Sequence, residues 1–182
     1  MDEVHVVEVA TTGTSGFPRD RVYQVAVCRM FADGSDFDTV FHGSVCLDPR
    51  DLGKEALDRM SSVYGTNPEE LYMGDPEADV VRGFQGSVFG RECTSFDVNT
   101  TFGKYLCYEP WDTTREVTLL PPVSCRLPRD ARTPAGDVHP IRHAYSVVCP
   151  GDPAEVGDRN GALELAQMSV SVLMVLRRNG MF

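Results

Sequence analysis

Glu8 and Asp97 are carboxylates next to predicted apolar segments, where they could act as ligands of a metal ion. Glu8 lies in the apolar run VHVVEVA, which leads into the turn-forming TTG of residues 11–13. Asp97 follows the stretch CTSF and precedes a predicted helix. Carboxylate oxygens are the ligands that hard divalent cations prefer. Ala10 shares a strand face with Glu8, because side chains alternate along a strand, and it offers no ligand atom.

A second set of residues could instead bind zinc. Cys125, His139, His143 and Cys149 offer two sulfurs and two imidazoles, and the interval between the histidines suits one face of a helix. The two cysteines lack the paired spacing that is usual in zinc sites. Most of the six cysteines lie in apolar segments, so buried thiols and solvent-facing histidines are the simpler interpretation. We expect no structural zinc.

The first half of the chain predicts the strands that position Glu8. An apolar run, an alternating segment that ends in the turn ADGS, and a returning segment indicate an antiparallel meander over residues 4–10, 20–35 and 36–49. Helical patterns follow over residues 51–65, 67–71 and 75–87. Asn67 and Asp75 are each followed by proline, which is typical of a helix start.

The second half predicts the elements around Asp97. We expect a buried strand within residues 87–96, a helix over 97–106 and a short last strand within 108–114. Residues 121–140 contain five prolines and predict a long excursion without helix at one edge of the sheet.

Two helices are expected to close the chain. One lies near 141–148, and the last begins near 162 and ends before Gly180. Its apolar stripe consists of residues 162, 165, 166, 169, 172, 173 and 176. The pattern therefore predicts one α/β domain over residues 1–182, with helices around a mixed sheet.

The charge balance favours protein partners over nucleic acid. The chain has 27 acidic and 17 basic residues, a net charge of −10. Such a surface repels polyphosphate unless basic groups cluster, and the nearest cluster is Arg126, Arg129 and Arg132. We therefore expect a protein partner or a second copy of the chain, and nucleic acid only as a weak ligand of a local groove.

Two further features bear on location. No apolar run approaches the roughly 20 residues that cross a bilayer, so we expect no membrane association. The first residues, MDEVHVV, lack the basic start of a secretory signal, which favours a cytoplasmic protein.

Six segments, in this order, resemble the motifs of the DEDD-type (DEDDh, DnaQ-like) 3′–5′ exonucleases. They are VVEVATTGTSG…DRVYQVAV, VFHGSVCLDP, YGTNPEEL, CTSFDVNTTFGKYL, PWDTT and NGALELAQMSVSVL. The resemblance spans nearly the whole chain. It implies the ribonuclease H-like fold, with a mixed sheet of about five strands flanked by helices.

The resemblance also implies a site that this sequence has mostly lost. Such exonucleases use two Mg²⁺ or Mn²⁺ ions, converging carboxylates and a histidine base. The first aspartate of the family falls at Glu8, the following glutamate at Ala10 and the second aspartate at Asp97. The histidine falls at Asn160 and the last aspartate at Leu165.

Leu165 is the most informative of these replacements. It lies on the apolar stripe of the last helix, where burial of a leucine contributes about 2 kcal/mol. Glu164 is rotated by about 100° around the helix and cannot replace it. Rescue of metal binding would need Asp158 as a ligand and His139 or His143 as a base.

Structural roles are open for the same residues. Glu8 is equally consistent with a carboxyl satisfied by backbone donors. Asp97 and Asn160 are both good helix N-caps. In the family, the residues matching Thr11, Thr12 and Gly13 meet the terminal nucleotide, whereas here they could simply shape a turn.

Phe96 is the fourth residue that the resemblance places at the nucleotide. It could stack on a base or pack in the core. We predict a catalytically degenerate exonuclease-like domain that acts by binding and needs no cofactor. The alternative is an active exonuclease that uses Mg²⁺ or Mn²⁺ at Glu8 and Asp97 with relocated ligands.

Overall fold

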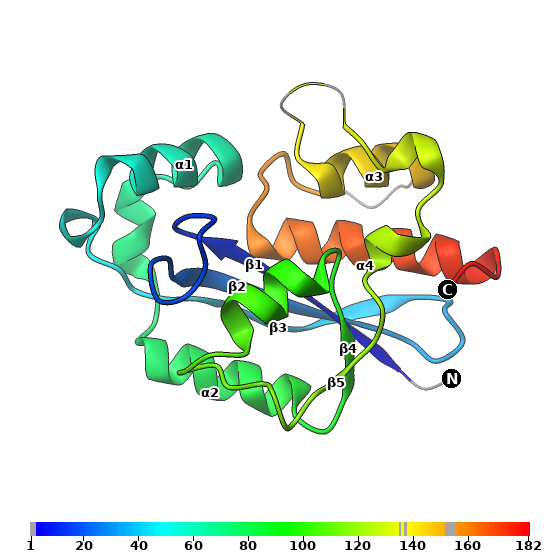
Figure 1. The fold of residues 1–182 in the computed structure, drawn as a ribbon, viewed down its shortest axis with the longest axis horizontal. Coiled ribbons are helices and arrows are strands. Elements are labelled where there is room, and N and C mark those ends of the chain that lie inside the picture. The colour runs from blue at the N-terminus through cyan, green and yellow to red at the C-terminus, as the bar shows by residue number, and fades with distance from the viewer. Residues whose placement is uncertain (1–2, 135, 137, 152–155) are drawn as a thin grey trace.

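A five-stranded mixed sheet forms the centre of the molecule (Figure 1). The computed structural model describes residues 3–134, 136, 138–151 and 156–182. The strands lie in the order β3-β2-β1-β4-β5. Their bounds are β1 Val4–Thr11, β2 Val22–Met30, β3 Phe37–Ser44, β4 Glu92–Thr94 and β5 Thr118–Leu119.

The predicted meander is confirmed. β1 pairs with β2 and β2 with β3, both antiparallel, and Glu8 lies opposite Ala26. β4 is parallel to β1 and β5 is parallel to β4, which makes the sheet mixed. The fold class expected from the sequence, α/β with about five strands, is therefore correct.

The described residues also form four α-helices, a π-helical segment and several 3₁₀ turns. The helices are α1 Lys54–Tyr64, α2 Glu77–Val88, α3 Pro140–Val148 and α4 Ala162–Arg178. A π-helical segment covers Asn99–Leu106, and 3₁₀ turns cover Pro49–Asp51, Pro68–Met73, Val123–Arg126 and Arg129–Ala131. None of the helices formed by described residues is long and apolar enough to cross a membrane.

Helices α4 and α2 cover opposite faces of the sheet (Figure 1). Glu8 and Gln24 point towards α4, because they bond to Ser169 and to the amide of Ala162. Gly43 faces α2, where an added Cβ would collide with Val80. Since side chains alternate along strands, Glu8 and Ala10 both face α4.

Helix α4 is buried more completely than its sequence stripe predicts. All seven predicted stripe positions are buried, and so are Met168, Val170 and Met174. Helix α3 packs against α4 as a further layer, which explains the additional burial. Gly180 follows the helix with a left-handed backbone (φ 67°), as expected for its C-terminal position.

The predicted strand within residues 108–114 is wrong. The amides of Trp111 and Asp112 both donate to the carbonyl of Tyr108, so the chain turns there. The Trp111 ring packs edge-to-face on Phe84, with 5.4 Å between ring centroids. Burial of this ring on α2 explains the apolar signal, and the last strand forms later, at Thr118–Leu119.

Three smaller predictions also need correction. The Pro-rich segment is not free of helix, because 3₁₀ turns begin directly after Pro122 and Pro128; residues 135 and 137 lie outside the described residues. Asp75 does not cap α2, whose N-cap is Pro76, because its backbone bonds to Ser44 and Cys46 instead. Burial of most cysteines is also wrong, since Cys46 and Cys125 are exposed and Cys107 is half-buried.

Candidate functional site

A cleft of about 430 Å³ opens at the carboxyl-terminal end of β1. Its floor, defined here as Glu8, Phe96 and Leu165, comes from β1, the residues after β4, and α4. Its rim, defined as Arg59, Asp97 and Lys104, comes from α1 and from the π-helical segment with the residues before it. The start of α3 lines one side. The cleft thus collects residues that are far apart in the sequence.

Glu8 is a buried carboxyl whose hydrogen bonds are made within the protein. Its Oε1 accepts from the backbone N–H of Phe96 (2.6 Å) and from the Ser169 hydroxyl (2.9 Å). Burial raises the pKa of Glu8 to about 8, an increase that the two hydrogen bonds reduce and that the charge of Asp97 reinforces. At pH 7 a carboxyl with this pKa is mostly protonated when no cation lies beside it.

Apolar side chains occupy the two positions at which the resemblance would place further carboxylates. Ala10 is fully buried on the same strand face as Glu8. Leu165 is only 2% exposed and lines the cleft, as the stripe of the last helix predicts. Ser169, one helical turn after Leu165, was identified from the sequence only as part of the stripe. A hydroxyl on an otherwise apolar stripe is the signal that could have found it.

Asp97 acts as a cap for the segment that it precedes. Its Oδ1 accepts from the backbone N–H groups of Asn99 (3.1 Å) and Thr100 (3.3 Å). Its Oδ2 accepts from the Thr100 hydroxyl at 2.8 Å. The structure therefore agrees with the capping role, although Asp97 also lines the cleft.

Asn160 is not the N-cap of α4, contrary to that prediction. The cap is Gly161, and the amide of Ala162 donates instead to Gln24 Oε1 of β2 at 3.3 Å. The Asn160 Oδ1 accepts from Arg142 Nε (2.9 Å), and its Nδ2 donates to the Val63 carbonyl (3.0 Å). Asn160 thereby ties α3 to the last turn of α1. It is not among the residues that line the cleft.

The residues proposed to rescue catalysis are mostly elsewhere. Asp158 and His143 are not in the lining of the cleft, and neither is Glu164, as its rotation around the helix predicts. His139 does line it, and burial, reinforced by Arg142 and Arg59, lowers its pKa to about 4. The ring accepts at Nδ1 from the amide of Ile141 (3.3 Å) and caps α3.

The four-residue zinc set is also not assembled. Among the described residues, no three His, Cys, Asp or Glu side chains gather closely enough to hold a metal ion. Cys125 is exposed, and His143 Nε2 lies 3.0 Å from the carbonyl of Asp130. Neither observation places Cys125 or His143 at a shared metal site.

The turn after β1 is rigidly built. The Thr11 hydroxyl and the Tyr105 hydroxyl both donate to the carbonyl of Gly13, each at 2.8 Å. The Thr12 hydroxyl accepts from the Arg21 amide at 2.9 Å. A Cβ at Gly13 would displace the Asp20 carboxylate, which accepts from the amides of Ser15 and Gly16. Thr11 and Gly13 line the cleft, whereas Thr12 does not.

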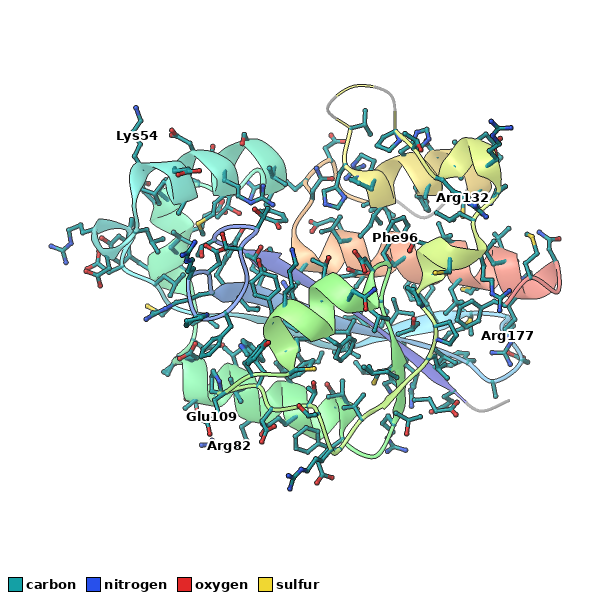
Figure 2. The ribbon with its side chains drawn as sticks, in the orientation of Figure 1. Lys54, Arg82, Phe96, Glu109, Arg132 and Arg177 are labelled. Atoms are coloured by element: carbon teal, nitrogen blue, oxygen red, sulfur yellow. The ribbon has the colours of Figure 1, made fainter. Side chains whose placement is uncertain are left out.

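Phe96 follows β4 in the chain and is labelled over α4 in Figure 2. Its side chain is 9% exposed and lines the cleft. It therefore packs mainly in the core and presents one edge to the cleft, so its predicted role beside a nucleotide stays a prediction.

Two cations on the rim were not found by sequence reasoning. Lys104 Nζ donates to the Thr14 carbonyl at 3.2 Å. The guanidinium carbon of Arg59 lies 5.9 Å from the centre of the Tyr64 ring. Arg59 is one charged residue of a surface helix, and no spacing in the sequence distinguishes it from its neighbours.

No family model and no curated protein matches this sequence. Solved structures do match it. *Escherichia coli* exonuclease I in complex with a dA16 oligonucleotide is 13% identical, with a TM-score of 0.68 over 98% of this chain and 41% of that one. The chain has the fold of these exonucleases. Cell-death related nuclease 4 (12% identity, TM-score 0.64) is covered over 65% of its length, and 99% of this chain is matched.

A third similar structure is a 3′-exonuclease that recognises the 3′ end of a histone mRNA stem-loop. It is 12% identical, with a TM-score of 0.60 over 98% of this chain and 83% of that one. The ribonuclease H-like exonuclease fold expected from the sequence is thus confirmed. The chain spans about two fifths of the length of *E. coli* exonuclease I.

The exonuclease fold implies a pair of divalent ions, and the residues present do not fit them. Each such ion takes about six oxygen ligands, and a two-metal site shares several carboxylates. Among the described residues that line this cleft, the carboxylates are Glu8 and Asp97, and both are engaged in hydrogen bonds within the protein. Leu165 adds an apolar wall beside them.

Proposed function

We propose that this exonuclease-fold domain is catalytically degenerate and acts by binding. The observation that carries the proposal is the state of Glu8. Its carboxyl is buried and bonded to Phe96 and Ser169, and the apolar side chain of Leu165 lines the cleft with it. A two-metal mechanism requires the opposite, which is a cluster of ionised carboxylates open to the ions.

The cleft itself supports a binding role. It is large enough for a small ligand, because such sites measure about 300–1,000 Å³. The turn at residues 11–13 is held in place by hydrogen bonds from Thr11 and Tyr105. *E. coli* exonuclease I, which has this fold, was solved with an oligonucleotide.

The acidic surface supports additional protein contacts. A net charge of −10 disfavours extended binding of nucleic acid outside the cleft. A protein partner or a second copy of the chain therefore stays part of the proposal, and nucleic acid would engage only locally.

An active Mg²⁺- or Mn²⁺-dependent 3′–5′ exonuclease is the alternative. Its support is that Glu8 and Asp97 line one cleft and that the charge of Asp97 reaches Glu8. It would require Glu8 to ionise, leave its hydrogen bonds and recruit ligands from outside the present cleft.

The decisive experiment follows a 5′-labelled single-stranded oligonucleotide with purified protein and Mn²⁺. We expect no stepwise shortening, with *E. coli* exonuclease I as the positive control. Shortening by the wild-type chain that is lost in Asp97→Ala and kept in Asp58→Ala, an exposed control on α1, would overturn the proposal.

A further inference from the structure

Arg59 is a cation on the rim of the cleft that forms no ion pair with another described residue, although Asp20 and Glu55 line a neighbouring pocket with it. None of the ion pairs among these residues involves it, and its Nε is shielded from solvent without a hydrogen-bond partner. Buried donors of this kind are nearly always satisfied. A guanidinium is permanently charged and presents its donors in a planar fork that matches phosphate.

The charges around Arg59 make the cleft locally basic in an acidic protein. Lys104 adds a second cation from the opposite element, held near the cleft by its bond to Thr14. Glu8 is buried on the floor and accepts from Phe96 and Ser169, and the His139 ring accepts from the amide of Ile141. Asp97 is the one acid that remains, and it is bonded to Thr100 and to backbone amides. Two cations therefore face one capped carboxylate.

The walls of the cleft add a surface for a planar group. Tyr64, Phe96 and Tyr105 line it together with Ile141 and Leu165. Aromatic and apolar walls with a few placed polar groups are typical of small-ligand sites. A ligand that combines an oxyanion with a planar ring fits both halves of this lining.

We propose that the cleft binds the phosphate of a nucleotide without a divalent ion, with Arg59 as its anchor and Lys104 as a second donor. The inference rests on the proposed function, since it assumes that the floor no longer holds metals. The protein's own cations would then supply the positive charge that metal ions supply in a two-metal site. The phosphate belongs either to a free nucleotide or to the end of a strand.

The test is calorimetric titration of the full chain with dTMP and with thymidine, in excess EDTA. We expect dTMP to bind and thymidine to bind at least about 10-fold more weakly, which corresponds to about 1.4 kcal/mol. Arg59→Met should weaken dTMP binding by about 10-fold or more, and Arg59→Lys by less. Arg82→Met is the matched control, because Arg82 lies on α2 away from the cleft, paired with Asp79 (Figure 2).

A dT oligonucleotide distinguishes the two sources of phosphate. Tighter binding of the oligonucleotide than of dTMP, again dependent on Arg59, assigns a strand end, and the reverse assigns a free nucleotide. Equal binding of thymidine and dTMP, binding that requires Mn²⁺, or unchanged binding by a folded Arg59→Met variant overturns the inference. A peptide with a free carboxylate that displaces dTMP and binds more tightly would also overturn it.

The two proposals fail separately. Mn²⁺-dependent shortening of oligonucleotides overturns the degenerate site and leaves EDTA-resistant dTMP binding to be measured on its own. Absence of dTMP binding overturns the phosphate site and leaves the degenerate site intact. Thermal melting of Arg59→Met and Arg59→Lys checks that loss of binding is not loss of folding.

Discussion

The floor and the rim of the cleft differ in whether their buried polar atoms have hydrogen-bond partners within the protein. On the floor, the polar oxygen of Glu8 is satisfied by Phe96 and Ser169, and Leu165 closes the space beside it. On the rim, the guanidinium of Arg59 has a buried donor that no described residue satisfies. The floor resembles a protein core, whereas the rim has an unpaired cationic donor that an anion can bind.

This contrast indicates which part of the cleft can keep a binding role when the metal ligands of the floor are replaced. Burial makes each unpaired charge costly, so a floor without metals is stable only if its carboxyl is neutral and its neighbours are apolar. The rim is in contact with water and can keep charged groups at little cost. The positive charge of the cleft therefore comes from residues of the rim.

Replacing Leu165 with aspartate should give the largest effect. It places an unpaired carboxylate beside Glu8 in the floor, which we expect to lower the free energy of unfolding by about 3–5 kcal/mol. The melting temperature should fall by about 10 °C. Met73→Asp, at a side chain that is 84% exposed, is the control and should change stability by less than about 0.5 kcal/mol.

Melting of the Leu165→Asp variant with Mn²⁺ tests the contrast between floor and rim. If Mn²⁺ restores the melting temperature of Leu165→Asp but does not affect the wild type, the floor needs only one carboxylate to hold ions. If Mn²⁺ raises the melting temperature of the wild type, the floor holds ions already and the contrast is wrong.

The pH dependence of stability measures the neutral state of Glu8. The pKa is raised from 4.5 to about 8 on folding, so between these pH values the folded state holds a proton that the unfolded state has released. Stability from this group therefore falls as pH rises from about 4.5 to 8, by up to about 1.4 kcal/mol per pH unit, and is constant above.

Glu8→Gln removes this dependence while keeping an oxygen that can accept from Phe96 and Ser169. Relative to the wild type, the variant should therefore gain stability progressively from pH 5 to pH 8. Urea unfolding at several pH values gives the difference. Parallel curves for the two proteins would show that Glu8 is ionised in the folded state.

Asp97 should give the smallest effect, because its carboxylate caps the segment that follows it. Asp97→Ala removes the cap and should cost about 1 kcal/mol, whereas Asp97→Asn keeps an acceptor and should cost only a few tenths. Urea unfolding in EDTA compares the two. An equal loss of free energy of unfolding in both variants would mean that Asp97 stabilises the fold mainly through its charge at the rim and not as a cap.

Much of the fold could be predicted from local pattern, and the failures have a common cause. The meander, α1, α3 and α4 follow apolar periodicity that needs no knowledge of partners. The wrong strand at 108–114 arose because Trp111 packs on Phe84, which is distant in sequence. Asn160 likewise has the right type for a cap and instead bonds to Arg142 and Val63.

The sequence by itself determined which atoms are available to the site. It replaces two expected carboxylates with Ala10 and Leu165 and retains acids only at Glu8 and Asp97. Only the tertiary structure decided what these atoms do, because pKa values and hydrogen-bond partners depend on contacts between distant segments. Ser169, which is 161 residues away in the sequence, donates a hydrogen bond to the Glu8 carboxyl, and α1 places Arg59 at the same cleft.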